Sequence, residues 1–113
     1  MLPKDKRIVK GSKIQEILKT KQLHFASPLF YFAAMANGID QSRLKVICSK
    51  KAGNAVARNK IRRRICAAVC DIWHKIGKNV DIVIIARPGI KEMADYRMAL
   101  VGGLQRLGLL CQE

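Results

Sequence analysis

Residues 43–69 read RLKVICSKKAGNAVARNKIRRRICAAV, and the spacing of the apolar side chains changes partway along this stretch. In its first six residues, Leu44, Val46 and Cys48 alternate with their neighbours, and a period of two is typical of a β-strand. Further on, apolar residues recur every three or four positions, as on one side of an amphipathic helix. They are Ala57, Ile61, Ile65, Ala68 and Ile72, with Val69 and Ile76 at the edge. The stretch therefore predicts a strand, a basic loop and a helix over about 54–76.

The flanking segments predict further helices and strands. Ser12 is a helix-cap candidate, because it precedes apolar residues at helical spacing, and Asn37-Gly38 after an aromatic run favours a tight turn between strands. The predicted elements are helices over about 12–20, 54–76 and 91–110, and strands within 23–36, 43–49 and 79–87, the last stopped by Pro88. In the last helix, Tyr96, Leu100, Leu104 and Leu107 share one side. This order predicts an α/β (α+β) sandwich, with one small sheet under helices, in a single domain spanning all 113 residues.

Composition and charge narrow the functional class. Half of the residues are hydrophobic, and the formal net charge is +14 with a pI near 10.2. A folded domain with this much positive charge repels itself, so an anionic partner is expected, with nucleic acid first and an anionic membrane surface second. The sequence has no apolar run of about 18 residues and no apolar signal-peptide core, which predicts a cytoplasmic protein with reduced thiols.

The basic loop and helix predict a docking surface for a polyanion. Residues 49–64 contain seven lysines and arginines and no acid. On the predicted helix, Arg58 lies one turn from Arg62 and Asn59 one turn from Arg63, so these residues gather on one side, whereas an ordinary solvated helix face usually mixes both signs of charge. Gly53 permits close backbone approach, and Asn54 is a helix-cap candidate at an end that attracts phosphate. The GxxxxGK[ST] spacing of nucleotide-hydrolase loops is absent, which favours a nucleic-acid backbone over a bound nucleotide.

The sequence gives little support to catalysis or metal binding by the polypeptide. The eight acidic residues are scattered, and neither histidine has an evident nucleophile or acid partner. Cys66, Cys70 and His74 follow one another at four-residue intervals, but the outer two lie about 12 Å apart along a helix, too far to share one ion. We therefore predict no catalytic and no metal-ligating residues.

With RLKVI before it and VDIVIIARPG after it, the string SKKAGNAVARNKIRRRI closely resembles the protein subunit of bacterial-type ribonuclease P. The resemblance runs from about Lys4 to Leu110. It implies a catalytic RNA partner, which this subunit helps to cut the 5′ leader from precursor tRNA, with Mg²⁺ serving the RNA-catalysed reaction and no cofactor bound by the protein alone. It implies no DNA or membrane partner. It also implies a four-stranded sheet with about three helices, like the second domain of ribosomal protein S5, and a left-handed βαβ crossover, although most such crossovers are right-handed.

The resemblance also implies site residues. Those expected to contact RNA are Lys50, Lys51, Asn54, Arg58, Asn59, Lys60, Arg62, Arg63 and Arg64. Those expected to line a leader-binding cleft between the first helix and the sheet are Ile14, Leu18, Phe32, Ser49 and Lys50. Two features depart from the family pattern. Ile14 and Leu18 stand where aromatic residues are usual, which weakens base stacking, and Cys66 replaces a usual arginine. The alternation of Phe30, Tyr31 and Phe32 leaves open which face of their strand is core.

Two other interpretations remain at this stage. A structural RNA-binding protein of ribosomal type would share the charge and the fold but would have no effect on leader cleavage. A membrane-binding amphipathic helix would share the basic face, but residues 54–76 carry only Trp73 as a large aromatic anchor.

Overall fold

The computed structural model describes residues 11–20, 22–39, 41–77, 79–87 and 96–109. The helices are α1 (Gly11–Thr20), α2 (Ala55–Asp71) and α3 (Tyr96–Arg106), and the strands are β1 (Leu23–Ala26), β2 (Phe30–Ala36), β3 (Arg43–Cys48) and β4 (Val80–Ala86). Two short 3₁₀ turns, η2 (Lys50–Ala52) and η3 (Trp73–Lys75), precede and follow α2. The predicted α+β class, with three helices and one four-stranded sheet, is confirmed.

The sheet is mixed, with strand order β1-β2-β4-β3. The pairs β1–β2 and β2–β4 are antiparallel, whereas β3 and β4 are parallel neighbours. A parallel pair needs a crossover connection, and α2 supplies it, as the family resemblance implied. The left hand of this crossover stays a prediction.

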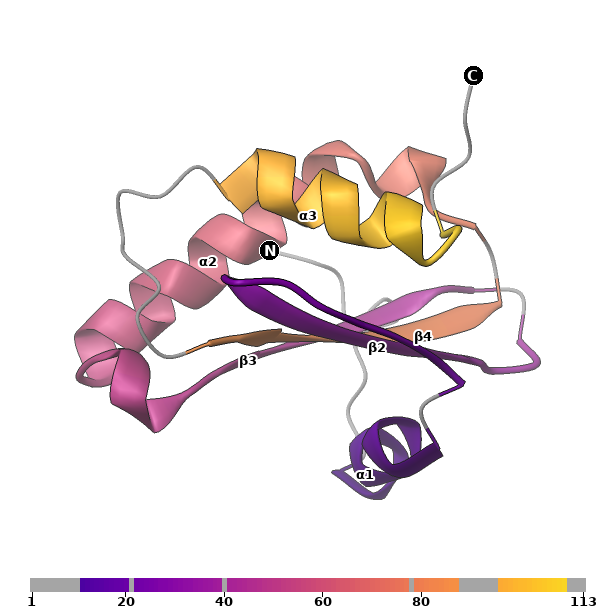
Figure 1. Ribbon diagram of the computed structural model, residues 1–113, viewed down its shortest axis with the longest axis horizontal. Coiled ribbons are helices and arrows are strands. Elements are labelled where there is room, and N and C mark those ends of the chain that lie inside the picture. The colour runs from indigo at the N-terminus through magenta and orange to yellow at the C-terminus, as the bar shows by residue number, and fades with distance from the viewer. Residues whose placement is uncertain (1–10, 21, 40, 78, 88–95, 110–113) are drawn as a thin grey trace.

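Helices cover both faces of the sheet (Figure 1). Of the helices described, α2 and α3 lie on one face and α1 lies on the other. Because side chains alternate along a strand, each face has its own apolar cluster. The larger cluster fills the space under α2 and α3, and the smaller one centres on Ile17, Ala33 and Val83 beneath α1. The sandwich of sheet and helices is thus present, and α1 adds a partial layer on the opposite side.

The burial of its side chains shows which face of β2 packs into the larger cluster. Phe30 and Phe32 are fully buried in the larger cluster, whereas Tyr31 is half-buried on the α1 side. Gly103 of α3 lies directly over the Phe32 ring, since a Cβ built on this glycine would be 2.2 Å from a ring carbon. The lack of a side chain at this position lets α3 approach β2 closely.

Several helix boundaries differ from the predicted ones. α1 begins at Gly11, so Ser12 lies inside the first turn and is not the cap. The helix predicted to run to Ile76 ends at Asp71 and is followed by η3. These limits differ because apolar spacing continues through the 3₁₀ turn, where Ile72 and Ile76 are still buried. The last helix ends at Arg106, and the predicted portions at 91–95 and 110 lie outside the described residues.

Candidate nucleic-acid interface

Local hydrogen bonds shape the loop between β3 and α2. The Ser49 hydroxyl oxygen accepts a hydrogen bond from the Lys51 backbone N–H at 3.2 Å. Asn54 caps α2, because its side-chain oxygen accepts from the Ala57 N–H at 2.9 Å, as predicted. Gly53 has φ +149°, and a Cβ there would lie 3.0 Å from the Ala57 Cβ. Glycine therefore suits this position, and the loop leads into an ordered helix N-terminus.

The predicted RNA-contacting residues gather on this loop and the first turns of α2. Most of them are exposed, namely Lys50, Lys51, Asn54, Asn59, Lys60, Arg63 and Arg64, whereas Arg58 and Arg62 are half-buried. The opposite side of the helix packs into the core through Ile61, Ile65 and Val69. We call this group of nine residues the α2 basic surface. Its role in binding RNA stays a prediction.

Two arginines of the α2 basic surface are held by neighbouring groups. Arg58 donates from Nε to the Asn54 carbonyl oxygen at 3.4 Å, and Arg62 donates from Nη2 to the Asn59 side-chain oxygen. Within the part of the chain that the structure describes, no carboxylate pairs with Arg58, Arg62 or Arg63. These three positive charges are therefore available to an external anion, with guanidinium geometry suited to phosphate oxygens.

The positive field of this surface reaches the end of β3. Cys48 is buried there, and burial raises the pKa of its thiol, while the charges of Arg62 and Arg58 act in the opposite direction. Burial dominates, so the thiol form is favoured. Cys48 thus packs as a small apolar residue under the basic surface, which is the usual role of a buried free cysteine.

The structure brings together only part of the predicted leader-binding cleft. Ile14 and Leu18 of α1 pack into the smaller apolar cluster beside Ile17, on the face where Tyr31 is half-buried. The placement of Phe32 in that cleft was wrong, because its ring is fully buried on the opposite face against Phe30. Tyr31 is therefore the aromatic residue of β2 on the α1 side.

Sequence alone left the face of β2 undecided, but a signal was present. Ala33 and Met35 share the face of Tyr31, and the small side chain of Ala33 leaves room for Ile17 of α1 to pack. Phe30 and Phe32 need the deeper space under α3, where Tyr96 also packs edge-on to Phe30 at 5.9 Å between ring centroids. The remaining cleft residues follow directly after β3; Ser49 is half-buried and Lys50 is exposed.

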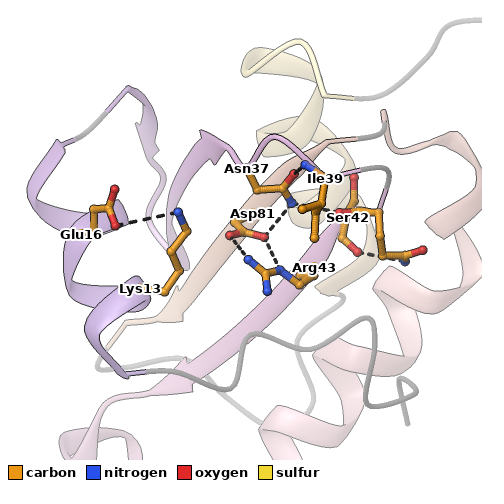
Figure 2. A network of polar contacts seen from close by, with 8 residues as sticks. Lys13, Glu16, Asn37, Ile39, Ser42, Arg43 and Asp81 are labelled. Atoms are coloured by element: carbon orange, nitrogen blue, oxygen red, sulfur yellow. Dashed lines mark hydrogen bonds and ion pairs between the residues drawn. The ribbon is translucent and has the colours of Figure 1, made fainter.

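An ion pair between half-buried Arg43 and a fully buried carboxylate, which the sequence did not reveal, lies at the other end of β3 (Figure 2). Arg43 donates from Nε to Asp81 Oδ1 at 2.8 Å and from Nη2 to Oδ2 at 2.7 Å, and Asn37 donates to Oδ1 at 2.9 Å. Asp81 is fully buried, and its hydrogen bonds raise the pKa of the Arg43 guanidinium. The strand register places the two residues directly opposite each other. The alternating strand pattern marked Arg43 only as outward-facing, so its partner on β4 was missed.

Two features of the described residues bear on the other classes of function. Among those residues, no three histidine, cysteine or acidic side chains lie close enough together to hold a metal ion. No described helix is both long and apolar enough to cross a membrane.

Comparison with known proteins identifies a family. The family model described as Ribonuclease P matches residues 2–104. The chain is 28% identical to the ribonuclease P protein component of Lactiplantibacillus plantarum, over 95% of this chain and 96% of that protein. It is 34% identical to the ribonuclease P protein component of Syntrophomonas wolfei, over 80% of this chain and 75% of that protein.

Solved structures agree with these matches. A mutant of the Staphylococcus aureus RNase P protein superimposes with a TM-score of 0.83 at 34% identity, covering 93% of this chain and 90% of that one. The RNase P protein from Thermotoga maritima superimposes with a TM-score of 0.73 at 27% identity, covering 89% of this chain and 93% of that one. The similarity therefore extends over almost the whole fold, including the loop and helix that carry the α2 basic surface.

Proposed function

The chain belongs to the ribonuclease P protein family, and from that premise we propose that it is the protein subunit of a ribonuclease P ribonucleoprotein. In this role it binds a catalytic RNA and the 5′ leader of precursor tRNA, and it promotes endonucleolytic removal of the leader. The observation that carries the proposal is the family match over residues 2–104, which includes the whole α2 basic surface.

The α2 basic surface is the part we assign to the catalytic RNA. Its arginines are exposed or half-buried on a rigid helix whose other side is core, so binding needs little ordering of the chain. Arg58 and Arg62, already oriented by Asn54 and Asn59, offer their remaining N–H groups to phosphate oxygens. The N-terminus of α2 adds a partial positive charge at the same place.

We assign the leader to the α1 side of the sheet, with a revised set of residues. Ile14 and Leu18 of α1 and Tyr31 of β2 are half-buried and pack against the same buried apolar cluster. A base packs there on Tyr31 by stacking and on the two aliphatic side chains by apolar contact. Ser49 and Lys50 lie where β3 ends, between this face and the α2 basic surface. The leader thus enters beside the RNA-docking end of the molecule.

The chemistry is assigned to the RNA partner. The described residues offer no cluster of carboxylates that would bind two metal ions for phosphodiester cleavage. We propose that Mg²⁺ acts in the RNA-catalysed step, and that the protein contributes binding and positive charge. Because phosphate contacts dominate nucleic-acid affinity and respond to salt, the benefit of the protein is greatest where magnesium is scarce.

Cleavage of precursor tRNA tests the proposal. The reaction is run at low magnesium with a bacterial ribonuclease P RNA alone, with this protein alone, and with both together. We expect cleavage only in the mixture. Cleavage by the protein alone would place the chemistry in the polypeptide. The test uses several bacterial ribonuclease P RNAs, each shown to be activated by its own protein. If this protein stimulates none of them, a structural RNA-binding protein is favoured instead.

A further inference from the structure

The sheet ends in two strands that pair with a described strand on one side only. The strand order β1-β2-β4-β3 places β1 and β3 at the two ends. β1 has only four residues, and a short edge strand offers few backbone groups to a partner. β3 has six residues and no proline, so its outer side presents a longer row of N–H and C=O groups. Of the two edges, β3 is therefore the better template for an added strand.

The hydrogen bonding of β3 shows which residues turn their backbone outward. The Ser49 N–H donates to the Ala86 carbonyl oxygen at 3.3 Å, so Ser49 continues the ladder to β4. Successive residues of a strand point their N–H and C=O groups to opposite sides, so every second residue before Ser49 also bonds towards β4. The residues between them face outward, and no described strand pairs with them. They are Leu44, Val46 and Cys48, which we call the β3 edge.

α2 lies beside the β3 edge on one face of the sheet. It packs on β3, whereas α3 packs on β1 and β2, and the two helices are neighbours (Figure 1). Asp71 marks the side of α2 that faces α3, because it pairs with Arg97 of α3 at 3.4 Å. At 3.6 residues per turn, Arg62 lies about 180° and Cys66 about 140° around the helix from Asp71. These two half-buried side chains are therefore on the side of α2 next to the β3 edge.

The levels of the two elements also match. Burial raises the pKa of the Cys48 thiol, and Arg62 is near enough for its charge to act against that rise. α2 connects two parallel strands, so it runs back along β3 in the opposite direction. One helical turn from Arg62 to Cys66 rises about 6 Å, and two strand residues from Cys48 to Val46 span about 6.6 Å. Cys66 thus lies at about the level of Val46.

Lys45 and Ile47 flank the same edge on the other face of the sheet. Lys45 is exposed and has no ion-pair partner among the residues described, and Ile47 is half-buried. Side chains of a strand added beside β3 would alternate between the two faces. On one face they would meet Arg62 and Cys66, and on the other Lys45 and Ile47. Each face therefore offers one cation and one apolar side chain to such a strand.

The open backbone groups and the charge select the kind of partner. A strand edge presents donors and acceptors in turn, whereas phosphate oxygens only accept, so a phosphate backbone leaves the outward C=O groups unpaired. A second copy of this chain has the same net charge of +14 and would bring like charges together along the edge. An extended acidic peptide pairs with the backbone groups and with both cations.

We propose that the β3 edge binds an extended acidic segment of a partner protein, which adds a strand to the sheet. Acidic side chains of this segment lie next to Lys45 and Arg62, and apolar side chains lie next to Ile47 and Cys66. The inference concerns a protein partner and does not depend on the proposed function in leader removal. Arg62 also belongs to the α2 basic surface, so Lys45 is the charge whose removal tests the peptide alone.

The test measures binding of the full chain to the fluorescein-labelled peptide Glu-Val-Glu-Val-Glu-Val, which matches the six residues of β3, by fluorescence anisotropy. A strand added to β3 turns every second N–H towards it, so the glutamate nitrogens or the valine nitrogens face the protein, but not both sets. Two further peptides carry N-methyl groups on all glutamates or on all valines. We expect one of them to lose about tenfold or more in affinity, because its hydrogen bonds to β3 are blocked, and the other to lose nothing.

Two lysine variants test the charge. Lys45→Ala should weaken binding of the unmethylated peptide by up to about fivefold, the usual upper range of an exposed ion pair. Lys75→Ala, which removes the same charge from an exposed lysine on η3, should leave the affinity unchanged. Alkylation of Cys66 locates the bound peptide. At about ten times the dissociation constant, about nine-tenths of the protein is occupied, so Cys66 should react with iodoacetamide about tenfold more slowly.

Four outcomes would overturn the inference. Failure of the unmethylated peptide to bind would remove the docking site. Equal affinities of the two methylated peptides would mean that no strand forms beside β3. Equal effects of the two lysine variants would show attraction to the net charge and not to Lys45, and unchanged alkylation of Cys66 in the complex would place the peptide on another surface.

Discussion

Replacing Gly103 by alanine tests the side of the sheet that Phe32 occupies. The new Cβ would lie 2.2, 2.3 and 2.8 Å from three carbons of the Phe32 ring, well inside ordinary contact distance. The ring has little freedom to move, because it is fully buried and its centroid is 6.2 Å from that of Phe25 and 5.9 Å from that of Phe30. Overpacking of this kind costs about 1–3 kcal/mol.

The neighbouring glycine provides a matched control. A Cβ on Gly102 meets nothing within 4 Å, so Gly102→Ala has only the helix-propensity gain of up to about 1 kcal/mol. Gly103→Ala has the same gain, offset by the clash. Because the gain is shared, we expect the two variants to differ by the cost of the clash, about 1–3 kcal/mol in unfolding free energy, or about 4–12 °C in Tm at about 4 °C per kcal/mol for a domain of this size.

Thermal and urea unfolding of both variants measure this difference. In a double-mutant cycle, Phe32→Leu shortens the side chain under the helix, so the double variant Gly103→Ala/Phe32→Leu should lose less stability than the sum of the single losses. If Gly103→Ala raises Tm as much as Gly102→Ala does, the Phe32 ring is not beneath α3. Phe32 would then be free to face α1, and its assignment to the leader cleft would be restored.

Three further predictions concern Arg62 of the α2 basic surface, the ion pair between Arg43 and Asp81, and the buried Cys48. Arg62→Ala should weaken binding to the catalytic RNA and make the plot of log affinity against log salt shallower by about one unit; an unchanged slope argues against a phosphate contact. Arg43→Ala should lower the unfolding free energy by about 3–5 kcal/mol, because it leaves the buried Asp81 carboxylate without its ion pair. A loss of unfolding free energy under about 1 kcal/mol, measured by urea titration, would contradict that reasoning. Cys48 should be alkylated at pH 8 more slowly than Cys66, because burial raises the pKa of the Cys48 thiol and lowers its thiolate fraction; mass spectrometry measures both rates. The unfolded chain ionises this thiol at a lower pH than the folded protein does. Stability should therefore fall as the pH rises past the ordinary thiol pKa. Faster labelling of Cys48 would show that the arginine charges outweigh burial.

Local patterns predicted the elements of the fold well, because each depends on a short stretch of chain. The alternation at Leu44 and Val46 predicted β3, and Asn54 predicted the start of α2 through its cap. The helix end was less predictable, because Ile76 is buried whether the chain before it forms an α-helix or a 3₁₀ turn. Apolar spacing reports burial and not the type of turn that achieves it.

The two parts of the candidate site differ in the same way in how well the sequence predicted them. The α2 basic surface is contiguous in sequence, so the charge pattern located it without knowledge of the sheet. The α1 side is assembled from α1, β2, β3 and β4, and its composition depends on which face of each strand points towards α1. Because side chains alternate, an error of one residue exchanges Tyr31 for Phe32 and moves an aromatic ring from the cleft to the core.

The same dependence on register explains why the pairing of Asp81 with Arg43 was not predicted. Asp81 lies in an apolar run of β4, where a buried carboxylate is expensive unless a cation pairs with it. Its partner is 38 residues away in sequence and becomes a neighbour only through the parallel register of β3 and β4. Since Asp81 balances Arg43, the charge that β3 presents to a polyanion rests mainly on Lys45. Net charge predicted an anionic partner, but only the strand pairing shows which cations of the α1 side are available to it.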